Sequence, residues 1–194
     1  MRKGAATRRA ILDGAVATAY RVGLGGLTIG ELAVTTGMSK SGLYAHFGSK
    51  TSLQLAVLEA ARDRFVDRVV RPALAMPRGE PRLRAYVENW IGVGLEREPG
   101  CALFVKASAE LDEQEGPVRD ALVDDHRDLL ASIAQVVRTG VDEGHLAPDT
   151  DADQFATDLD GIMLALYHAH RLLRDPRAET RARRAFENLL DAAR

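Results

Sequence analysis

Apolar side chains recur every three or four positions along most of this chain, and glycine or proline residues interrupt the recurrence at intervals. That spacing places apolar residues on one face of a helix, and the alternating β-branched runs typical of strands are missing. In the first segment, for example, Ile11, Ala15, Ala19 and Val22 share one face. The pattern therefore predicts an all-α fold of about nine helices.

Capping residues and helix breakers set the expected boundaries. Thr28, with Glu31 three residues later, has the pattern of a capping box, and Ser39 and Ser49 are placed to cap the next two helices. Gly37 permits a tight turn between the two short helices. We expect helices at about residues 7–22, 29–36, 40–47, 50–70, 81–98, 102–111, 117–143, 152–173 and 180–192.

Charge is distributed unevenly along the chain. The first fifty residues carry seven basic and two acidic side chains, a net charge of +5, whereas the whole chain carries −2, so the remainder carries −7. A basic segment attached to an acidic body is expected when only that segment meets phosphate. The alternative is chance, because fifty residues are a small sample.

The segment from Thr28 to Lys50 reads TIGELAVTTGMSKSGLYAHFGSK. A helix-turn-helix needs a short support helix, a tight turn and a second helix that presents small polar residues outward. Gly37 supplies the turn, and the apolar residues that would face inward are Ile29, Leu32, Ala33, Met38, Leu43 and Phe47. The segment therefore predicts a DNA-binding motif; the alternative is a plain helical hairpin within a bundle.

The polar residues of this segment suit contacts with DNA. Lysine can donate to guanine or to phosphate, a serine lets the helix approach base edges closely, and the amides at helix N-termini bind phosphate. Tyrosine and histidine can hydrogen-bond phosphate oxygens. The candidate DNA-binding residues are Thr28, Ser39, Lys40, Ser41, Tyr44, His46 and Lys50.

This segment resembles the tetracycline-repressor (TetR-like) family of bacterial regulators, through Thr28, Ile29, Leu32, Ala33, Gly37, Ser39, Leu43, Tyr44, His46, Phe47, Lys50 and Leu53. The resemblance covers residues 7–55 in detail, and the rest agrees in length and helical order. It implies a nine-helix dimer that binds an operator and is released by a ligand. It makes Thr28, Tyr44 and Lys50 phosphate contacts, and Ser39, Lys40 and Ser41 candidate base readers. Gly30, which loosens the support helix, and Ala45, a methyl where many relatives carry a larger side chain, depart from the pattern and leave base preference open.

The expected domain division follows from this motif. We expect a helix-turn-helix DNA-binding domain over residues 1–50, the start of a linking helix over residues 50–70, and a ligand-binding and dimerisation domain over residues 51–194. A connector rich in proline and glycine at about residues 72–81 is of the sort seen between domains.

The C-terminal half contains aromatic and polar residues that could line a small-molecule site, because such sites have mostly apolar walls and a few polar groups. The alternative for each of them is ordinary core or surface. The candidate ligand-binding residues are Tyr86, Trp90, Phe104, His126, Met163 and Tyr167.

The last two long helices have the composition of a subunit interface. Two such helices from each subunit would form a four-helix bundle about a two-fold axis. The candidate interface residues are Phe155, Leu159, Ile162, Leu166, Phe186, Leu189 and Leu190, and the alternative is packing inside one subunit. The arginines between residues 171 and 184 are expected to meet acidic residues or solvent rather than DNA.

Other classes of site find little support. Cys101 has no partner thiol in the chain, so we expect a small buried residue rather than a redox sensor, and no disulfide argues for export. The five histidines are scattered, and we expect no metal and no cofactor. No catalytic triad order or phosphate loop is present, so we expect no enzyme. We expect a cytoplasmic protein without a signal peptide or membrane span.

These observations together predict a DNA-binding transcriptional regulator, most simply a repressor released from operator DNA by a small molecule. Ligand binding in the body would tilt the linking helix and change the spacing of two reading helices. The alternatives are a ligand-independent or architectural DNA-binding protein and an activator. The net negative charge of residues 51–194 disfavours an architectural protein, because such a protein binds DNA over much of its surface.

Overall fold

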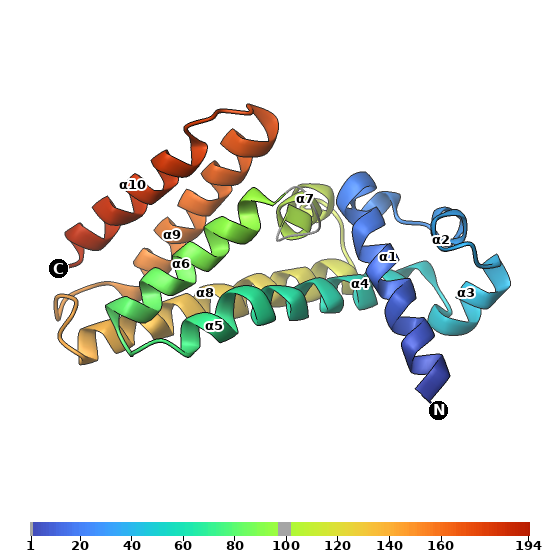
Figure 1. The fold of residues 1–194 in the computed structure, drawn as a ribbon, viewed down its shortest axis with the longest axis horizontal. Coiled ribbons are helices and arrows are strands. Elements are labelled where there is room, and N and C mark those ends of the chain that lie inside the picture. The colour runs from blue at the N-terminus through green and yellow to red at the C-terminus, as the bar shows by residue number, and fades with distance from the viewer. Residues whose placement is uncertain (1, 97–101) are drawn as a thin grey trace. The chain divides into compact units, whose positions relative to one another are not determined.

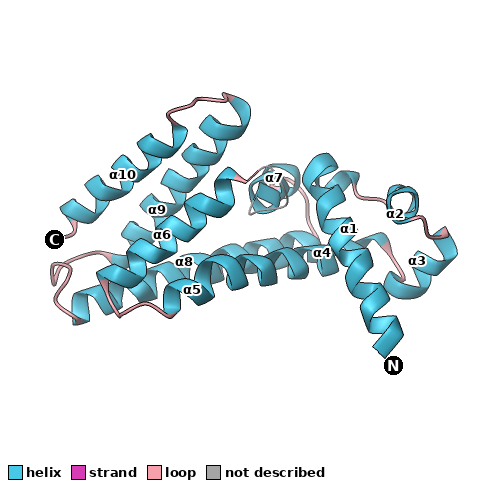
Figure 2. Ribbon diagram, in the orientation of Figure 1, coloured by secondary structure: helices cyan, strands magenta, loops and turns pink. Residues whose placement is uncertain are grey.

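The computed structural model describes residues 2–96 and 102–194, and over these ranges it contains helices and loops but no strand (Figures 1 and 2). With α4 to α5 counted as one continuous helix, the described residues form nine helices, so the predicted all-α fold is confirmed. The elements are α1 (Arg2–Gly26), α2 (Ile29–Thr36), α3 (Lys40–Phe47), α4 (Lys50–Phe65), a π-helical turn (Val66–Val70), α5 (Arg71–Leu74), α6 (Glu80–Leu95), α7 (Ala102–Leu111), α8 (Pro117–Asp142), α9 (Ala152–Tyr167), a second π-helical turn (His168–Leu172) and α10 (Ala178–Ala192).

Several helix boundaries differ from the predicted ones, beginning with the first helix, which starts at Arg2 rather than at about residue 7. The helix α1 extends to Gly26, but the backbone of Gly23 has a non-helical conformation (φ 81°, ψ 170°), which marks a kink beside the predicted end. The linking helix continues past residue 70 to Leu74, through Pro72. The helix predicted over residues 81–98 ends earlier, at Leu95, because the backbone of Glu96 is extended (φ −63°, ψ 139°). The position of Cys101 lies outside the described residues.

The π-helical turn explains how the helix continues through Pro72. Proline has no N–H to donate, and in an α-helix its ring collides with the carbonyl four residues earlier. Just before it, the Arg71 N–H bonds to the Val66 carbonyl five residues back rather than four. The wider turn changes the register of the helix at the point where proline enters it.

The described chain forms two compact units. The first contains α1 to α4 up to Arg64, α7 and the start of α8 up to Asp125; the second contains Phe65 to α6 and the chain from His126 onward. Packing of α7 against α1 assigns α7 to the first unit, although it lies beyond the domain boundary expected at residue 50. A sequence pattern marks helix ends but does not say which helices pack together.

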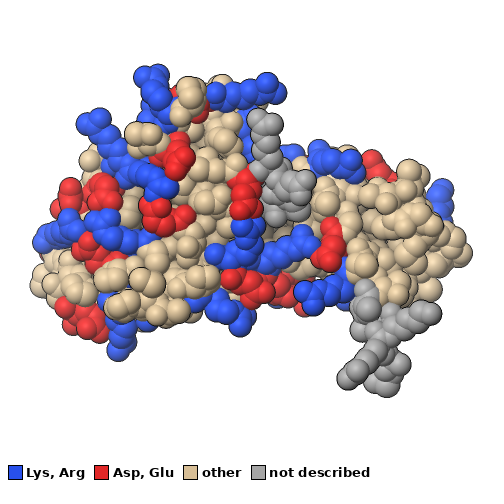
Figure 3. Space-filling view, in the orientation of Figure 1, with Lys and Arg blue, Asp and Glu red and all other residues tan. Residues whose placement is uncertain are grey.

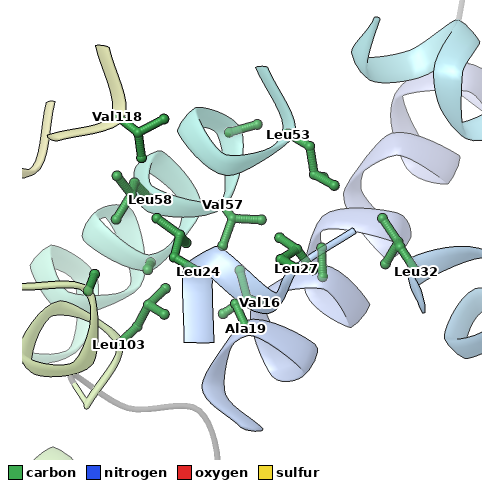
Figure 4. Close-up of a cluster of buried hydrophobic side chains, with 14 of the residues drawn as sticks. Val16, Ala19, Leu24, Leu27, Leu32, Leu53, Val57, Leu58, Leu103 and Val118 are labelled. Carbon is green, nitrogen blue, oxygen red and sulfur yellow. The ribbon is translucent and has the colours of Figure 1, made fainter. Parts of the chain in front are cut away.

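An apolar core joins the helices of the first unit (Figure 4). Leu24, Leu27 and Leu32 are fully buried, as are Leu53 and Leu103. They come from α1, the following loop, α2, α4 and α7, so the DNA-binding motif is fixed to a scaffold wider than its own two helices.

The second unit has a core between α6, α8, α9 and α10, to which Leu83, Ile91, Ile133 and Leu159 contribute fully buried side chains. Charged side chains of both signs intermingle on the surface of this unit (Figure 3). One of their ion pairs links α6 to α10, with Arg84 donating to both carboxylate oxygens of Glu187 at 2.6 and 3.0 Å. Among the described residues, no helix has the length and hydrophobicity needed to cross a bilayer.

Candidate nucleic-acid interface

Side-chain caps define the two helices of the DNA-binding motif. Thr28 Oγ1 accepts from the Glu31 N–H at 3.1 Å at the start of α2, and Ser39 Oγ accepts from the Gly42 N–H at 3.1 Å at the start of α3. Gly37 ends α2 in the left-handed region (φ 65°), where a side chain would be strained. The predicted caps and turn are therefore present, and α2 and α3 form a helix-turn-helix.

The second helix, α3, presents a polar face. Leu43 and Phe47 are buried against the core, whereas Ser39, Lys40 and Ser41 are exposed. The Ser39 and Ser41 hydroxyl groups lie 3.2 Å apart at the start of the helix. Two donors side by side at an exposed helix start can reach base edges or phosphate oxygens.

Two further candidates lie later on α3. Tyr44 is 53% exposed, so its hydroxyl can reach solvent or a phosphate. His46 is half-buried beside Phe47, with ring centroids 6.4 Å apart. The same Phe47 ring lies 5.6 Å from the guanidinium carbon of Arg8 on α1. Arg8 was not a predicted site residue, because only the fold brings it to the end of α3.

Lys40 lies over Gly30 of the support helix. A Cβ on Gly30 would be 3.6 Å from Lys40 Cε and 3.8 Å from Lys40 Nζ. The sequence suggested only that glycine loosens α2 at this position. In the structure, the lysine side chain lies across the start of α2, and a Cβ on Gly30 would make only ordinary van der Waals contact with it.

Lys50 lies at the start of α4, where Ser49 caps the helix by accepting from the Ser52 N–H at 3.0 Å. Its Nζ donates to the Gly25 carbonyl at 2.7 Å. The ammonium group is exposed and bears three N–H donors, so this contact leaves donors for a phosphate.

Side chains from α4 and α7 also hold the C-terminal end of α1. Glu110 accepts from the Gly25 N–H at 2.8 Å, Lys106 donates to the Tyr20 carbonyl at 2.6 Å, and Gln54 donates to the Leu24 carbonyl at 2.8 Å. None of these three side chains was predicted to take part in the site. Each joins residues at least 30 positions apart, and helical spacing gives no signal for such contacts.

Three of the candidate ligand-binding residues, Tyr86, Trp90 and Met163, are buried in the second unit. The rings of Tyr86 and Trp90 are 6.2 Å apart, and Phe65 meets Trp90 edge-on at 5.5 Å. Tyr167 and His126 are half-buried in the same unit. The remaining candidate, Phe104, packs against the core of the first unit, so the structure does not group it with the others.

The pKa values of Tyr86 and of Asp160, which interacts with His126, are shifted. Burial raises the pKa of Tyr86 to about 12, an effect that Ser132 only partly opposes. The contact with Ser132 falls outside acceptable hydrogen-bond geometry, so the Tyr86 hydroxyl makes no well-formed hydrogen bond among the described residues. Burial also raises the pKa of the Asp160 carboxyl, and the charge of His126 works in the opposite direction. Asp160 was not predicted as a site residue.

The candidate interface residues divide into two groups. Those buried inside the single chain are Phe155, Leu159, Leu166, Phe186 and Leu190. Ile162 and Leu189 are half-buried. The buried five take part in intrachain packing, the alternative raised by the sequence, and only the other two retain surface for a partner.

Several arginines of the C-terminal cluster meet acidic groups. Arg177 and Arg181 both pair with Asp175, and Arg183 pairs with Glu88 and Glu179. For these three arginines the expected acidic neighbours are present. Within the described ranges, no group of three or more His, Cys, Asp or Glu side chains could hold a metal ion.

Two family models match the chain. "Bacterial regulatory proteins, tetR family" matches residues 11–57, the part that contains the helix-turn-helix, and "Tetracyclin repressor-like, C-terminal domain" matches residues 79–186. The second match alone covers more than half of the chain, and the first extends into the linking helix as far as residue 57.

Individual relatives agree with these models. The chain is 32% identical over 89 residues to the nucleoid occlusion factor SlmA of Salmonella paratyphi B, a match that covers 46% of this chain and 44% of that protein. It therefore spans under half the length of that curated relative. A TetR transcriptional regulator from Chloroflexus aurantiacus superposes with a TM-score of 0.85 at 26% identity, covering 98% of this chain and 96% of that one.

A third comparison is with AibR, whose structure gives a TM-score of 0.71 at 20% identity, covering 96% of this chain and 97% of that one. At this identity the likeness concerns the fold alone. The two family models identify the family of this chain, and the capped helix-turn-helix and the nine helices of the described residues agree with them. The chain belongs to the TetR family of DNA-binding transcriptional regulators.

Proposed function

We propose that this regulator is a repressor that leaves its operator when a small molecule binds in the second unit. The observation that carries the DNA-binding part is the exposed start of α3, where Ser39 caps the helix and Lys40 and Ser41 are exposed beside it. Ser39, Lys40 and Ser41 are the proposed base readers, and Lys40 could instead contact phosphate. Thr28, Tyr44, His46 and Lys50 are the proposed phosphate contacts.

The protein would act as a homodimer in the cytoplasm, where its DNA lies. A two-fold dimer presents two reading helices to successive major grooves, about 34–36 Å apart. Each half-site would then contact one α3, and the operator would be close to palindromic.

The Tyr86 hydroxyl supports the ligand-binding part of the proposal. A buried polar group without a well-formed hydrogen bond costs free energy, about 1–3 kcal/mol, so its presence calls for an explanation, and a ligand would supply one. Aromatic neighbours around it are typical of small-molecule sites. The related AibR was crystallised with isovaleryl coenzyme A and operator DNA, so that protein accepts both kinds of partner.

Selection of DNA duplexes from a random library by the full-length wild-type protein tests the DNA-binding part. We expect a palindromic consensus. Lys40→Ala should relax specificity at one base pair if Lys40 reads a base, or weaken binding to all duplexes and lower the salt-dependence slope by about 0.9 if it contacts phosphate. The matched control is Arg184→Ala, which removes an exposed charge from α10. Equal behaviour of the two variants would contradict a role for Lys40.

The ligand-binding part is tested with the duplex so selected. A panel of small molecules is screened first for a rise in the melting temperature of the protein, and then for release of the duplex. A compound that does both supports the repressor proposal. Compounds that raise the melting temperature but leave the affinity for DNA unchanged would contradict ligand-induced release.

A second candidate function is that of a ligand-independent DNA-binding protein. The match to a protein named as a nucleoid occlusion factor favours it. Chromatin immunoprecipitation of the full chain separates the two functions. A few sites close to promoters indicate a regulator, either repressor or activator according to where the operator lies, whereas many sites spread over the chromosome indicate the second function.

A further inference from the structure

Gly25 lies near the end of α1, and charged side chains from two other helices hold both of its backbone groups. Glu110 of α7 accepts from its N–H at 2.8 Å. Lys50 of α4 donates to its carbonyl at 2.7 Å. Gly25 thus connects an acidic residue of α7 to a lysine that is proposed to bind phosphate.

The preceding turn of α1 is shaped to admit the Glu110 carboxylate. Gly23 is buried, and a Cβ at that position would lie 1.7 Å from Glu110 Oε1. Its φ of 81° also lies where side chains are strained. One turn earlier on α7, Lys106 donates to the Tyr20 carbonyl at 2.6 Å. Two side chains of α7 therefore hold the end of α1.

The contact with the Gly25 carbonyl restricts the long, flexible side chain of Lys50. A lysine that must be ordered when DNA binds loses rotamer freedom at that moment, which lowers affinity. Because the Gly25 carbonyl already holds the Lys50 ammonium group, part of this rotamer entropy is lost when the protein folds and not when DNA binds. The ammonium group keeps further N–H donors for a phosphate.

We propose that Glu110 is a positioning residue for DNA binding: by fixing Gly25, it holds the Lys50 ammonium group in place to contact the DNA backbone. This inference rests on the proposed phosphate contact of Lys50. Glu110 itself touches no DNA.

The direction in which DNA affinity changes when Glu110 is removed distinguishes a positioning role from simple electrostatic repulsion. Removing an acidic side chain from a DNA-binding unit weakens repulsion of phosphate and should tighten binding. Loss of positioning should weaken binding instead. Glu115→Ala is the matched control, because Glu115 is an exposed acid of the same unit and the loop after α7.

The experiment measures the dissociation constants of full-length variants for the duplex selected by the wild-type protein, using fluorescence anisotropy. We expect Glu110→Ala to weaken binding about tenfold, Lys50→Met to weaken it by a similar factor, and the double variant to bind no more weakly than Lys50→Met. Glu110→Gln keeps an oxygen that can accept from Gly25 and should bind within about twofold of wild type. Glu115→Ala should bind as tightly as wild type or more tightly.

Three results would overturn the inference: unchanged or tighter binding by Glu110→Ala, multiplicative effects in the double variant, or equal losses for Glu110→Ala and Glu115→Ala. If circular dichroism shows that Glu110→Ala does not fold, Glu110→Asp replaces it, since its shorter side chain withdraws the carboxylate from Gly25. A wild-type protein that selects no duplex would instead overturn the proposed function, and with it the premise of this inference.

Discussion

At the scale of single residues, Tyr86 departs furthest from an ordinary core side chain. The residue is 1% exposed and its ring lies beside Trp90, yet its hydroxyl makes no well-formed hydrogen bond among the described residues. A phenylalanine would fill the same space without burying a polar atom. The hydroxyl therefore adds nothing evident to the stability of the described chain, and ligand binding offers a reason for it.

We expect Tyr86→Phe to leave the free energy of unfolding at neutral pH unchanged or to raise it by up to about 1 kcal/mol, because only the poorly aligned contact with Ser132 is lost. The wild-type protein should also lose stability as the pH rises from about 10 towards 12. The pKa of Tyr86 is raised to about 12 in the folded protein, so the unfolded chain ionises first and is favoured in that window. Tyr86→Phe should lack this component of the loss.

Urea unfolding of both proteins at a series of pH values measures these effects. The wild-type protein should lose on the order of 2 kcal/mol more than the variant across the window. A variant that is less stable than wild type by more than about 1 kcal/mol at neutral pH would mean that the hydroxyl has a partner after all.

At the scale of elements, the helices of the DNA-binding motif were predictable because their signals are local. Thr28 and Ser39 cap the helices that follow them, and each cap needs only residues three positions apart. The continuation of the linking helix through Pro72 was missed, because proline usually ends a helix and a π-helical turn has no evident sequence signature.

The contacts of the site were less predictable than its helices. Glu110 and Gly25 are 85 positions apart, and Arg8 meets Phe47 only because α1 packs beside α3. The sequence does not show which distant residues meet, and for this reason Phe104 was grouped with Trp90 by residue type although it packs in the core of the first unit. Residue type predicted chemistry here, but only folding decided which groups meet.

The cap of α3 can be separated from its contact with DNA. Ser39→Ala should lower the free energy of unfolding by about 1 kcal/mol, because the Gly42 N–H loses its acceptor. Ser39→Asp should keep most of the stability, since aspartate caps helices well, but weaken DNA binding by placing a negative charge where phosphate is expected. Ser39→Asn, a neutral cap, is the control for charge.

Urea unfolding and anisotropy with the selected duplex measure the two properties on the same samples. DNA binding by Ser39→Asp as tight as that of Ser39→Asn would place the start of α3 away from the DNA.

At the scale of the whole molecule, the proposed dimer depends on surface that a single chain leaves uncovered. Leu189 is half-buried on α10, whereas its neighbour Phe186 is 3% exposed. We expect Leu189→Glu to shift the protein to monomers with little loss of helix content, because a charge on a contacting surface is desolvated only in the dimer. Phe186→Ala should instead destabilise each subunit by about 3–5 kcal/mol.

Sedimentation equilibrium over a range of protein concentrations, together with urea unfolding, distinguishes these outcomes. A Leu189→Glu protein that sediments as wild type does would exclude this part of α10 from the interface.

The close contact between Gly23 and Glu110 also limits the order in which this sequence can change over evolutionary time. A side chain at position 23 would force the Glu110 carboxylate, the flexible end of its side chain, away from Gly25, whereas a shorter residue at position 110 leaves position 23 undisturbed. Even then, the left-handed backbone at Gly23 disfavours most replacements. In descendants of this chain, we expect glycine at position 23 to outlast glutamate at position 110, and the reverse order to be rare.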